Sequence, residues 1–406
     1  REIVGAPRDR FGIMVTVVRR LAGLLGLVGA LLVLLLAPVL SRMTFGDQDH
    51  SVAFVALSIV VFLASIVSGE QAVLQAGERF KRLARASMWG GMAATVISIL
   101  LIRFFSYDGI VPSIISFSVC ISAAYFVGGG RVAGSRLPRG EMYKASMPVL
   151  RLGVYMTASI FITHLAQYVF LVWLGRIAGD STVGIYQAGY TVVNQYVGLV
   201  FAAIAVEYYP RISAVADSRW RVSVFVRHEM SMLLWGLLAA VVLFINLVPV
   251  VIRILYSDDF LPAVDYVTVA SVGTIFKAVS FVMAYVILAR GDGVVFLVTE
   301  SLSAVFYLVL SVIGFQEGMT MLGVAYVVWY AVYAVIVLVV CCCRYRVGGL
   351  GKPLLYSLCV IMIVATQATL CHFGFYLVAT IMSGVIVPIA LTMLYLLFLK
   401  RRTLKE

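Results

Sequence analysis

A stripe of polar residues runs through one of the most apolar stretches of the chain, residues 183–212. It follows the spacing i, i+4, i+7 and i+11 and consists of Gln187, Thr191, Asn194 and Gly198. This spacing places the four residues on one face of an α-helix. An unpaired amide is costly in hydrocarbon, so the face is expected to look at another helix or at a water-lined cavity. Both alternatives stay open at this point.

Lys277 lies in the middle of a second apolar stretch, residues 263–289. An ammonium group at the centre of a bilayer costs about 2.5–3.5 kcal/mol or more, so it should face a cavity, a carboxylate or the anion of a ligand. A diphosphate is an anion of this kind. The alternative is a lysine that pairs inside the helix bundle for packing alone.

Glu300 is the predicted partner of Lys277, because it lies on the next apolar stretch, residues 293–314, which returns antiparallel. At a rise of about 1.5 Å per residue the two α-carbons should differ in depth by roughly 6 Å, which two long side chains can bridge. Glu300 is therefore either a structural ion-pair partner or a proton or sodium site.

Further candidates lie on the stretch 150–175. His164 and Gln167 are three residues apart and so share a helix surface that suits sugar hydroxyls, although hydrogen-bonded packing explains them equally well. Arg151 falls at the predicted cytoplasmic boundary, where it would line an entrance or simply report topology. The substrate or cavity candidates are Lys277, Glu300, His164, Gln167, Gln187, Asn194 and Arg151.

Enzymatic and nucleotide-binding patterns are missing from the sequence. The pattern G-x-x-x-x-G-K-[ST] does not occur, which argues against ATP hydrolysis by this chain. Three cysteines lie in apolar stretches, and Cys341, Cys342 and Cys343 form a run without the spaced Cys or His partners of a zinc site. We expect no catalytic residues, no metal and no cofactor.

Composition defines the class of protein. Of 406 residues, 63% are hydrophobic and 12% are charged, far from the roughly 45–50% and 25% of soluble proteins. This composition predicts an all-α polytopic membrane protein. Twelve apolar segments are long enough to span a bilayer: 21–40, 52–72, 84–104, 109–128, 150–175, 182–206, 231–255, 263–289, 293–314, 320–342, 353–371 and 375–398.

The basic residues predict the orientation. If the N-terminal end and every second loop are cytoplasmic, 26 of the 31 Lys and Arg residues lie on that side, four lie opposite, and Lys277 lies within a span. Such a bias places both ends of the chain in the cytoplasm. The net charge of +12 therefore reports topology and does not indicate nucleic-acid binding.

A shift of 214 positions superimposes early spans on later ones, with 84–104 falling on 293–314 and 109–128 near 320–342. This indicates a parallel repeat of the kind found in secondary transporters. The predicted organisation is an N-lobe at 1–128, a cytoplasmic linker at 129–149, a six-helix C-lobe at 150–342, and a terminal helix pair with a basic tail at 343–406. Spans 150–175 and 182–206 have no early counterpart, so two helices of the N-lobe are expected upstream of Arg1. The complete architecture would have 14 helices, as two pseudo-symmetric six-helix lobes around a central cavity plus the terminal helix pair.

Four segments carry a family resemblance: G-I-Y-Q-A-G-Y (184–190), E-Y-Y-P-R-I-S (207–213), S-D-D-F-L-P-A (257–263) and A-R-G-D (289–292). With the repeat, they resemble the polysaccharide flippases of the multidrug/oligosaccharidyl-lipid/polysaccharide exporter superfamily, most of all the O-antigen type. The resemblance implies transfer of an undecaprenyl-diphosphate-linked oligosaccharide to the outer leaflet of a bacterial inner membrane by alternating access. It also implies membrane lipids, a polysaccharide polymerase and a chain-length protein as partners.

Three other functions remain open. A drug/cation antiporter of the same fold should have a cavity dominated by acidic groups, whereas the clear intramembrane charges here are Glu300 and Lys277. A lipid II flippase fits the sequence as well as an oligosaccharide flippase does. A membrane-bound glycan polymerase should carry a large outer loop with arginines, and the predicted outer loops are short.

Overall fold

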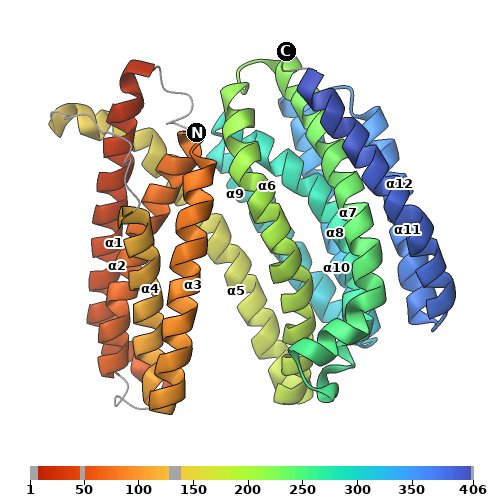
Figure 1. Ribbon diagram of the computed structural model, residues 1–406, viewed down its shortest axis with the longest axis horizontal. Helices are drawn as coiled ribbons and strands as arrows, with labels where there is room; N and C mark the ends of the chain where they lie inside the picture. The colour runs from red at the N-terminus through yellow and green to blue at the C-terminus, as the bar shows by residue number, and fades with distance from the viewer. Residues whose placement is uncertain (1–7, 46–50, 128–138, 404–406) are drawn as a thin grey trace. The chain divides into compact units, whose positions relative to one another are not determined.

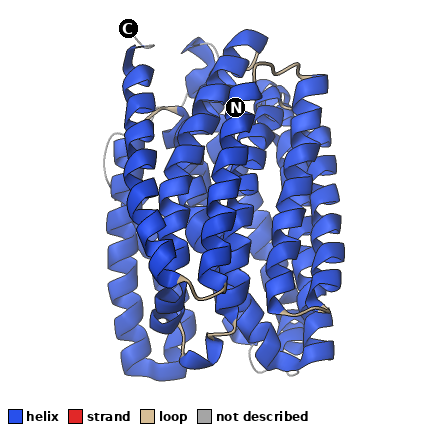
Figure 2. Cartoon of the chain, turned by 90° about the vertical axis from the view of Figure 1, so that its right-hand side faces the viewer, coloured by secondary structure: helices blue, strands red, loops and turns tan. Residues whose placement is uncertain are grey.

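The computed structural model describes residues 8–45, 51–127 and 139–403. Within these ranges every regular element is a helix, as Figure 2 shows. The predicted all-α class is thus confirmed for the described part of the chain. Of the predicted linker, residues 129–138 lie outside the described residues, and residues 139–149 belong to a long helix.

The chain divides into two compact units, Arg1–Leu150 and Arg151–Glu406. In the first unit α1 packs against α2, and α4 packs against both α2 and α3 (Figure 1). Its elements are α1 (Arg8–Phe45), α2 (Ser51–Ala76), α3 (Phe80–Phe105), a 3₁₀ turn η1 (Ser106–Gly109) and α4 (Ile110–Val127). An ion pair joins the first two helices, since Arg19 donates to both carboxylate oxygens of buried Glu70 at 2.7 and 2.8 Å.

The second unit contains most of the helices that follow. Helix α5 (Arg139–Thr191) begins in the first unit and continues into the second unit, which starts at Arg151. The remaining elements are the π-helical turn η2 (Val192–Tyr196), α6 (Val197–Ala214), α7 (Arg219–Leu255), the 3₁₀ turn η3 (Asp258–Phe260), α8 (Ala263–Arg290), α9 (Gly293–Phe315), α10 (Met319–Arg344), α11 (Gly351–His372) and α12 (Tyr376–Thr403).

Helix α8 forms the centre of the second unit. It packs most extensively against α10, and also against α6, α7 and α11. In its most apolar stretch 78% of the residues are buried, against 44% for α7 and α10. A helix that is apolar all round is buried on all sides, and α8 is such a helix. Any polar group in its middle must therefore find its partners within the protein.

Ten helical runs among the described residues are long and apolar enough to cross a membrane. Two of them, of 47 and 65 residues, are much longer than the ~20 residues that one crossing requires. The shorter one contains the 3₁₀ turn η1. The longer one contains Gly179, whose backbone is non-helical at φ 80° and ψ 168°, between the predicted spans 150–175 and 182–206. The multi-pass architecture is clear, whereas the count of twelve spans stays a prediction.

Two glycines allow α8 and α10 to approach closely. A Cβ atom on Gly273 of α8 would lie 2.7 Å from the ring of Tyr326 on α10. A Cβ atom on Gly323 of α10 would lie 2.8 Å from the side chain of Val269 on α8. Small residues at a helix interface are typical of membrane proteins, where close packing contributes much of the stability. These contacts fix the rotation of α10, and with it the tyrosines that α10 presents to α8.

The two last helices, α11 and α12, pack against α7 within the second unit (blue in Figure 1). Buried amides hold them there. The Gln367 side chain of α11 donates to Asn246 of α7 at 2.7 Å and to Ser383 of α12 at 3.1 Å. Each such interhelical bond contributes about 0.6–2 kcal/mol in a membrane. The predicted terminal pair is therefore tied to its neighbours by hydrogen bonds as well as by apolar contact.

Candidate functional site

Lys277 lies at the middle of α8, and its ammonium group has a neutral hydrogen-bond partner. Nζ donates to Oδ1 of Asn194 at 2.9 Å. The rings of Phe201 and Tyr330 also lie near the ammonium, with centroids 5.8 and 5.3 Å from Nζ. Ring faces attract a cation at these distances, more strongly when water is excluded. The ammonium is thus held by an amide and two aromatic rings.

Asn194 is oriented by three hydrogen bonds. Besides the bond from Lys277, Oδ1 accepts a bond from the hydroxyl of Tyr326 at 3.0 Å. Its Nδ2 donates to the backbone carbonyl of Tyr190 at 3.2 Å. Both donors therefore face Oδ1 while the amide nitrogen faces the helix backbone. The arrangement fixes which end of the amide meets the lysine.

Asn194 owes its position to the π-helical turn Val192–Tyr196. A turn of this kind contains one residue more than an α-helical turn and frees a backbone carbonyl, and it occurs often at functional sites. The turn also breaks the predicted polar stripe, because a spacing of 3.6 residues does not hold through it. Gln187 is exposed, and no hydrogen bond from its side chain occurs among the described residues. The common face of all four residues therefore stays a prediction.

Glu300 of α9 has a different partner from the one that the sequence suggested. Its carboxylate accepts a hydrogen bond from the hydroxyl of Tyr333 on α10. Among the described residues no ion pair joins Glu300 to Lys277. The reason is the packing order: α8 packs mainly against α10 and only slightly against α9. Neighbours in sequence are thus separated in space by the tyrosines of α10.

A group of buried tyrosines connects the candidates. Tyr326, Tyr330 and Tyr333 follow the spacing i, i+4 and i+7, which places all three on one face of α10. The rings of Tyr266 and Tyr326 pack at 6.3 Å, and Tyr186 shares a 3.1 Å hydrogen bond with Tyr307. We call Tyr186, Tyr190, Tyr266, Tyr307, Tyr326, Tyr330 and Tyr333 the tyrosine cluster. The three tyrosines of α10 were missed in the sequence, although their spacing signals a common face.

His164 and Gln167 join this network from α5. His164 Nδ1 lies 3.3 Å from Gln167 Oε1, and Gln167 Nε2 donates to the Tyr190 hydroxyl at 2.5 Å. Tyr190 contacts both pairs through different atoms, because its hydroxyl accepts from Gln167 and its backbone carbonyl accepts from Asn194 Nδ2. Arg151 is exposed at the start of the second unit. The structure therefore pairs four of the seven candidates, Lys277 with Asn194 and His164 with Gln167, whereas Glu300 bonds Tyr333.

The chemistry of the site is that of binding. The ammonium of Lys277 makes no ion pair with any described carboxylate, so its charge is not neutralised by direct contact. No group of His, Cys, Asp and Glu side chains in the described ranges could hold a metal ion. Neutral hydroxyls and aromatic faces surround the cation, which suits an anionic or hydroxyl-rich ligand.

Solved structures with the same fold are transporters. A MATE protein in the straight conformation superposes with a TM-score of 0.70 at 16% identity, covering 85% of this chain and 83% of that one. The Vibrio cholerae MATE transporter VcmN in its bent form gives 0.70 at 14% identity, covering 85% and 80%. A MOP superfamily transporter from Pyrococcus furiosus, described as having a binding pocket of reverse polarity that suggests a different function, gives 0.67 at 14%, covering 85% and 83%.

These likenesses define the fold as that of the MATE transporters of the multidrug/oligosaccharidyl-lipid/polysaccharide superfamily. Among curated proteins none matches the sequence significantly. The family model described as "Polysaccharide biosynthesis protein" matches residues 14–265, more than half of the chain. The chain belongs to this family of polysaccharide biosynthesis proteins. Its fold is that of solved transporter structures, and the predicted superfamily is confirmed.

Proposed function

We propose that the chain is a flippase that moves an undecaprenyl-diphosphate-linked oligosaccharide, the repeat unit of an O-antigen or another surface polysaccharide, from the cytoplasmic to the outer leaflet. It works by alternating access in the inner membrane of a bacterium, with both ends of the observed chain in the cytoplasm. A polysaccharide polymerase and a chain-length protein receive the product.

One observation carries this proposal: the ammonium of Lys277, in the middle of α8, is bonded to a neutral amide. Lys277 Nζ lies 2.9 Å from Asn194 Oδ1 and has no carboxylate in contact. An uncompensated ammonium at this depth is costly unless a ligand anion offsets it. A diphosphate offers two negative phosphoryl groups that an ammonium can bind as a point charge.

The family supports a glycan as the rest of the cargo. The matching family is described as one of polysaccharide biosynthesis proteins. The matched residues 14–265 include Asn194 and His164. Tyrosine rings can stack on sugars, and the imidazole and amide of His164 and Gln167 can bond their hydroxyls. The Pyrococcus transporter supports reading pocket polarity as a guide to function within this fold. In this proposal Gln187 and Arg151, both exposed, bind outlying parts of the cargo.

A drug/cation antiporter is the second candidate, because solved structures of this fold are MATE transporters and because Glu300 is an acidic group within a span. Glu300 already accepts a hydrogen bond from Tyr333, and Lys277 opposes a cationic cargo electrostatically. The anionic cargo is therefore favoured. A lipid II flippase uses the same diphosphate chemistry and is distinguished by the glycan.

The test is complementation of a bacterial strain that lacks its O-antigen flippase, with surface glycan and membrane abundance both measured. Lys277→Ala and Lys277→Gln should abolish surface glycan at normal abundance. Lys277→Arg should keep part of the activity, since the charge remains and its geometry changes. Lys81→Ala, at an exposed lysine of the first unit, is the matched control and should behave as the unmodified chain.

Two results would contradict the proposal. Full glycan export by Lys277→Gln would remove the role of the ammonium. If expression of the chain raises the tolerance of the cells to cationic drugs without any export of glycan, the antiporter would be favoured. A transport assay with the purified protein in vesicles distinguishes the two flippase activities. Transfer of lipid II without transfer of an O-antigen precursor would identify the chain as a lipid II flippase.

A further inference from the structure

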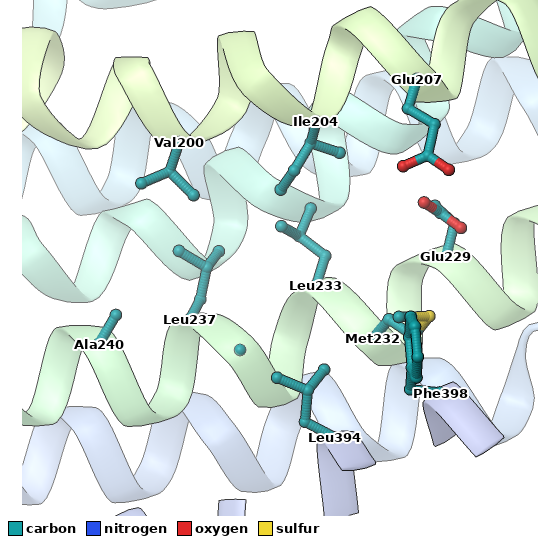
Figure 3. A pocket seen from close by; sticks show the side chains of 11 residues that line it. Val200, Ile204, Glu207, Glu229, Met232, Leu233, Leu237, Ala240, Leu394 and Phe398 are labelled. Atoms are coloured by element: carbon teal, nitrogen blue, oxygen red, sulfur yellow. The ribbon is translucent and has the colours of Figure 1, made fainter. Parts of the chain in front are cut away.

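A groove in the second unit lies between α6 and α7 and is closed at its base by α12. It encloses 410 Å³ and is lined mainly by apolar side chains, among them Val200 and Ile204 of α6, Leu233 and Leu237 of α7, and Leu394 of α12 (Figure 3). Helices α6 and α7 both pack on α8, and α12 packs on α7, so the groove separates two helices that share a neighbour. We call it the α6–α7 groove.

One end of the α6–α7 groove is charged. Glu207 of α6 and Glu229 of α7 line it there, and Figure 3 shows their carboxylates turned toward one another. Glu207 also forms an ion pair with Arg211, one turn later on α6. Glu229 is only 8% exposed. This end of the groove therefore places two carboxylates and one guanidinium group together.

The apolar part of the groove runs along the helices from this charged end. From Glu229 to Ala240 on α7 the rise is about 16 Å, and from Glu207 back to Val200 on α6 it is about 10 Å. Both stretches lie inside runs that are apolar enough to cross a membrane. Glu229 precedes the predicted span 231–255 by two residues, which puts the charged end at the edge of the hydrocarbon. A slot with this direction fits an acyl chain, and its charged end fits a headgroup.

We propose that the α6–α7 groove binds one membrane phospholipid with a primary ammonium headgroup. The ammonium donates to Glu229 and Glu207, the phosphate accepts from Arg211, and one acyl chain lies against Leu233 and Leu237. Two carboxylates disfavour a purely anionic headgroup, and a choline headgroup has no N–H to donate. The inference concerns a second site and does not depend on which cargo the chain transports.

Native mass spectrometry of the purified chain tests this binding. The chain is reconstituted in vesicles that contain equal amounts of phosphatidylethanolamine, phosphatidylcholine and phosphatidylglycerol, and the retained lipids are identified. The ethanolamine lipid should be retained roughly tenfold over the choline lipid, because a charge-assisted hydrogen bond discriminates by about this factor. Equal retention of all three lipids overturns the proposal.

Two pairs of variants locate the site. Glu229→Gln should remove the preference for ethanolamine, while Glu317→Gln, at an exposed carboxylate on the α9–α10 turn, should keep it. Val200→Trp fills the groove from an exposed position and should reduce lipid retention. Leu199→Trp, its exposed neighbour that does not line the groove, should not.

Thermal unfolding of each variant in detergent distinguishes lost binding from lost fold. Unchanged unfolding temperature with lost ethanolamine preference supports the proposal. An ethanolamine preference that survives both Glu229→Gln and Val200→Trp overturns it. Retention of a simple amphiphilic amine without any retained ethanolamine phospholipid overturns it as well.

Discussion

The ammonium of Lys277 and the amide oxygen of Asn194 are 2.9 Å apart, although 83 positions separate them in the chain. No described carboxylate neutralises the lysine by direct contact, because its nearest acceptor is the oxygen of a neutral amide. The same oxygen also accepts from Tyr326 at 3.0 Å, which holds it in place when the lysine moves to a ligand. In the proposed function, this pair is the resting position of the cation that binds the anionic cargo.

Replacing Asn194 by Asp should abolish glycan export while the protein remains in the membrane. The new carboxylate would form an ion pair with Lys277 and neutralise the charge that the cargo requires. We expect a loss of about tenfold or more in surface glycan, measured together with membrane abundance. Gln316→Glu makes the same charge change at an exposed amide on the turn between α9 and α10, outside the candidate site, and should export normally. Normal export by Asn194→Asp would show that the free charge of Lys277 is not needed.

The double variant Lys277→Ala with Glu300→Ala should show no rescue. Since Glu300 bonds Tyr333 and Lys277 bonds Asn194, the two side chains share no hydrogen-bond partner. Effects of residues without a shared partner add within about 0.3–0.5 kcal/mol. Thermal unfolding of both single variants and of the double variant measures the coupling. Recovery of stability in the double variant would reveal an ion pair that this packing does not contain.

Gly273→Ala should destabilise the second unit by about 1–3 kcal/mol, which is typical of overpacking. The added Cβ would lie 2.7 Å from the Tyr326 ring, so α8 and α10 must separate and the bond from Tyr326 to Asn194 must lengthen. Gly384→Ala in α12 is the control, because no atom lies within 4 Å of its Cβ position. It should be neutral or gain up to about 1 kcal/mol from helix propensity. Equal unfolding temperatures for both variants would contradict the close packing.

Single cysteines should establish the predicted orientation. In a background without the six native cysteines, a cysteine at Gln316, on the turn between α9 and α10, should react with an impermeant thiol reagent in intact cells. A cysteine at Asp217, on the turn between α6 and α7, should react only after the cells are opened. Both positions are exposed, so accessibility within the protein does not bias the comparison. Labelling of a cysteine at Asp217 in intact cells would show that the orientation is opposite to the predicted one.

The helices were largely predictable, because apolar length and basic loops depend on local sequence alone. Lys277 was also recognisable, since an intramembrane ammonium stands out in any composition. The hydrogen-bond partner of Lys277 could not be recognised in the sequence. The sequence prediction paired Lys277 of α8 with Glu300 of the next helix, α9. In the structure Gly273 and Gly323 let α10 approach α8 instead. The choice of neighbouring helix depends on the complementary shapes of two helix surfaces, and a hydropathy pattern contains no information about these shapes.

The π-helical turn Val192–Tyr196 has a consequence for everything that follows it on the chain. An α-helix turns by about 100° per residue, so deleting one residue here would rotate the whole of α6 by that angle. Phe201 would leave the ammonium of Lys277, and Glu207 would leave the carboxylate of Glu229. The one additional residue in this turn therefore determines the rotation of α6, and a change of length here would move both side chains away from these neighbours.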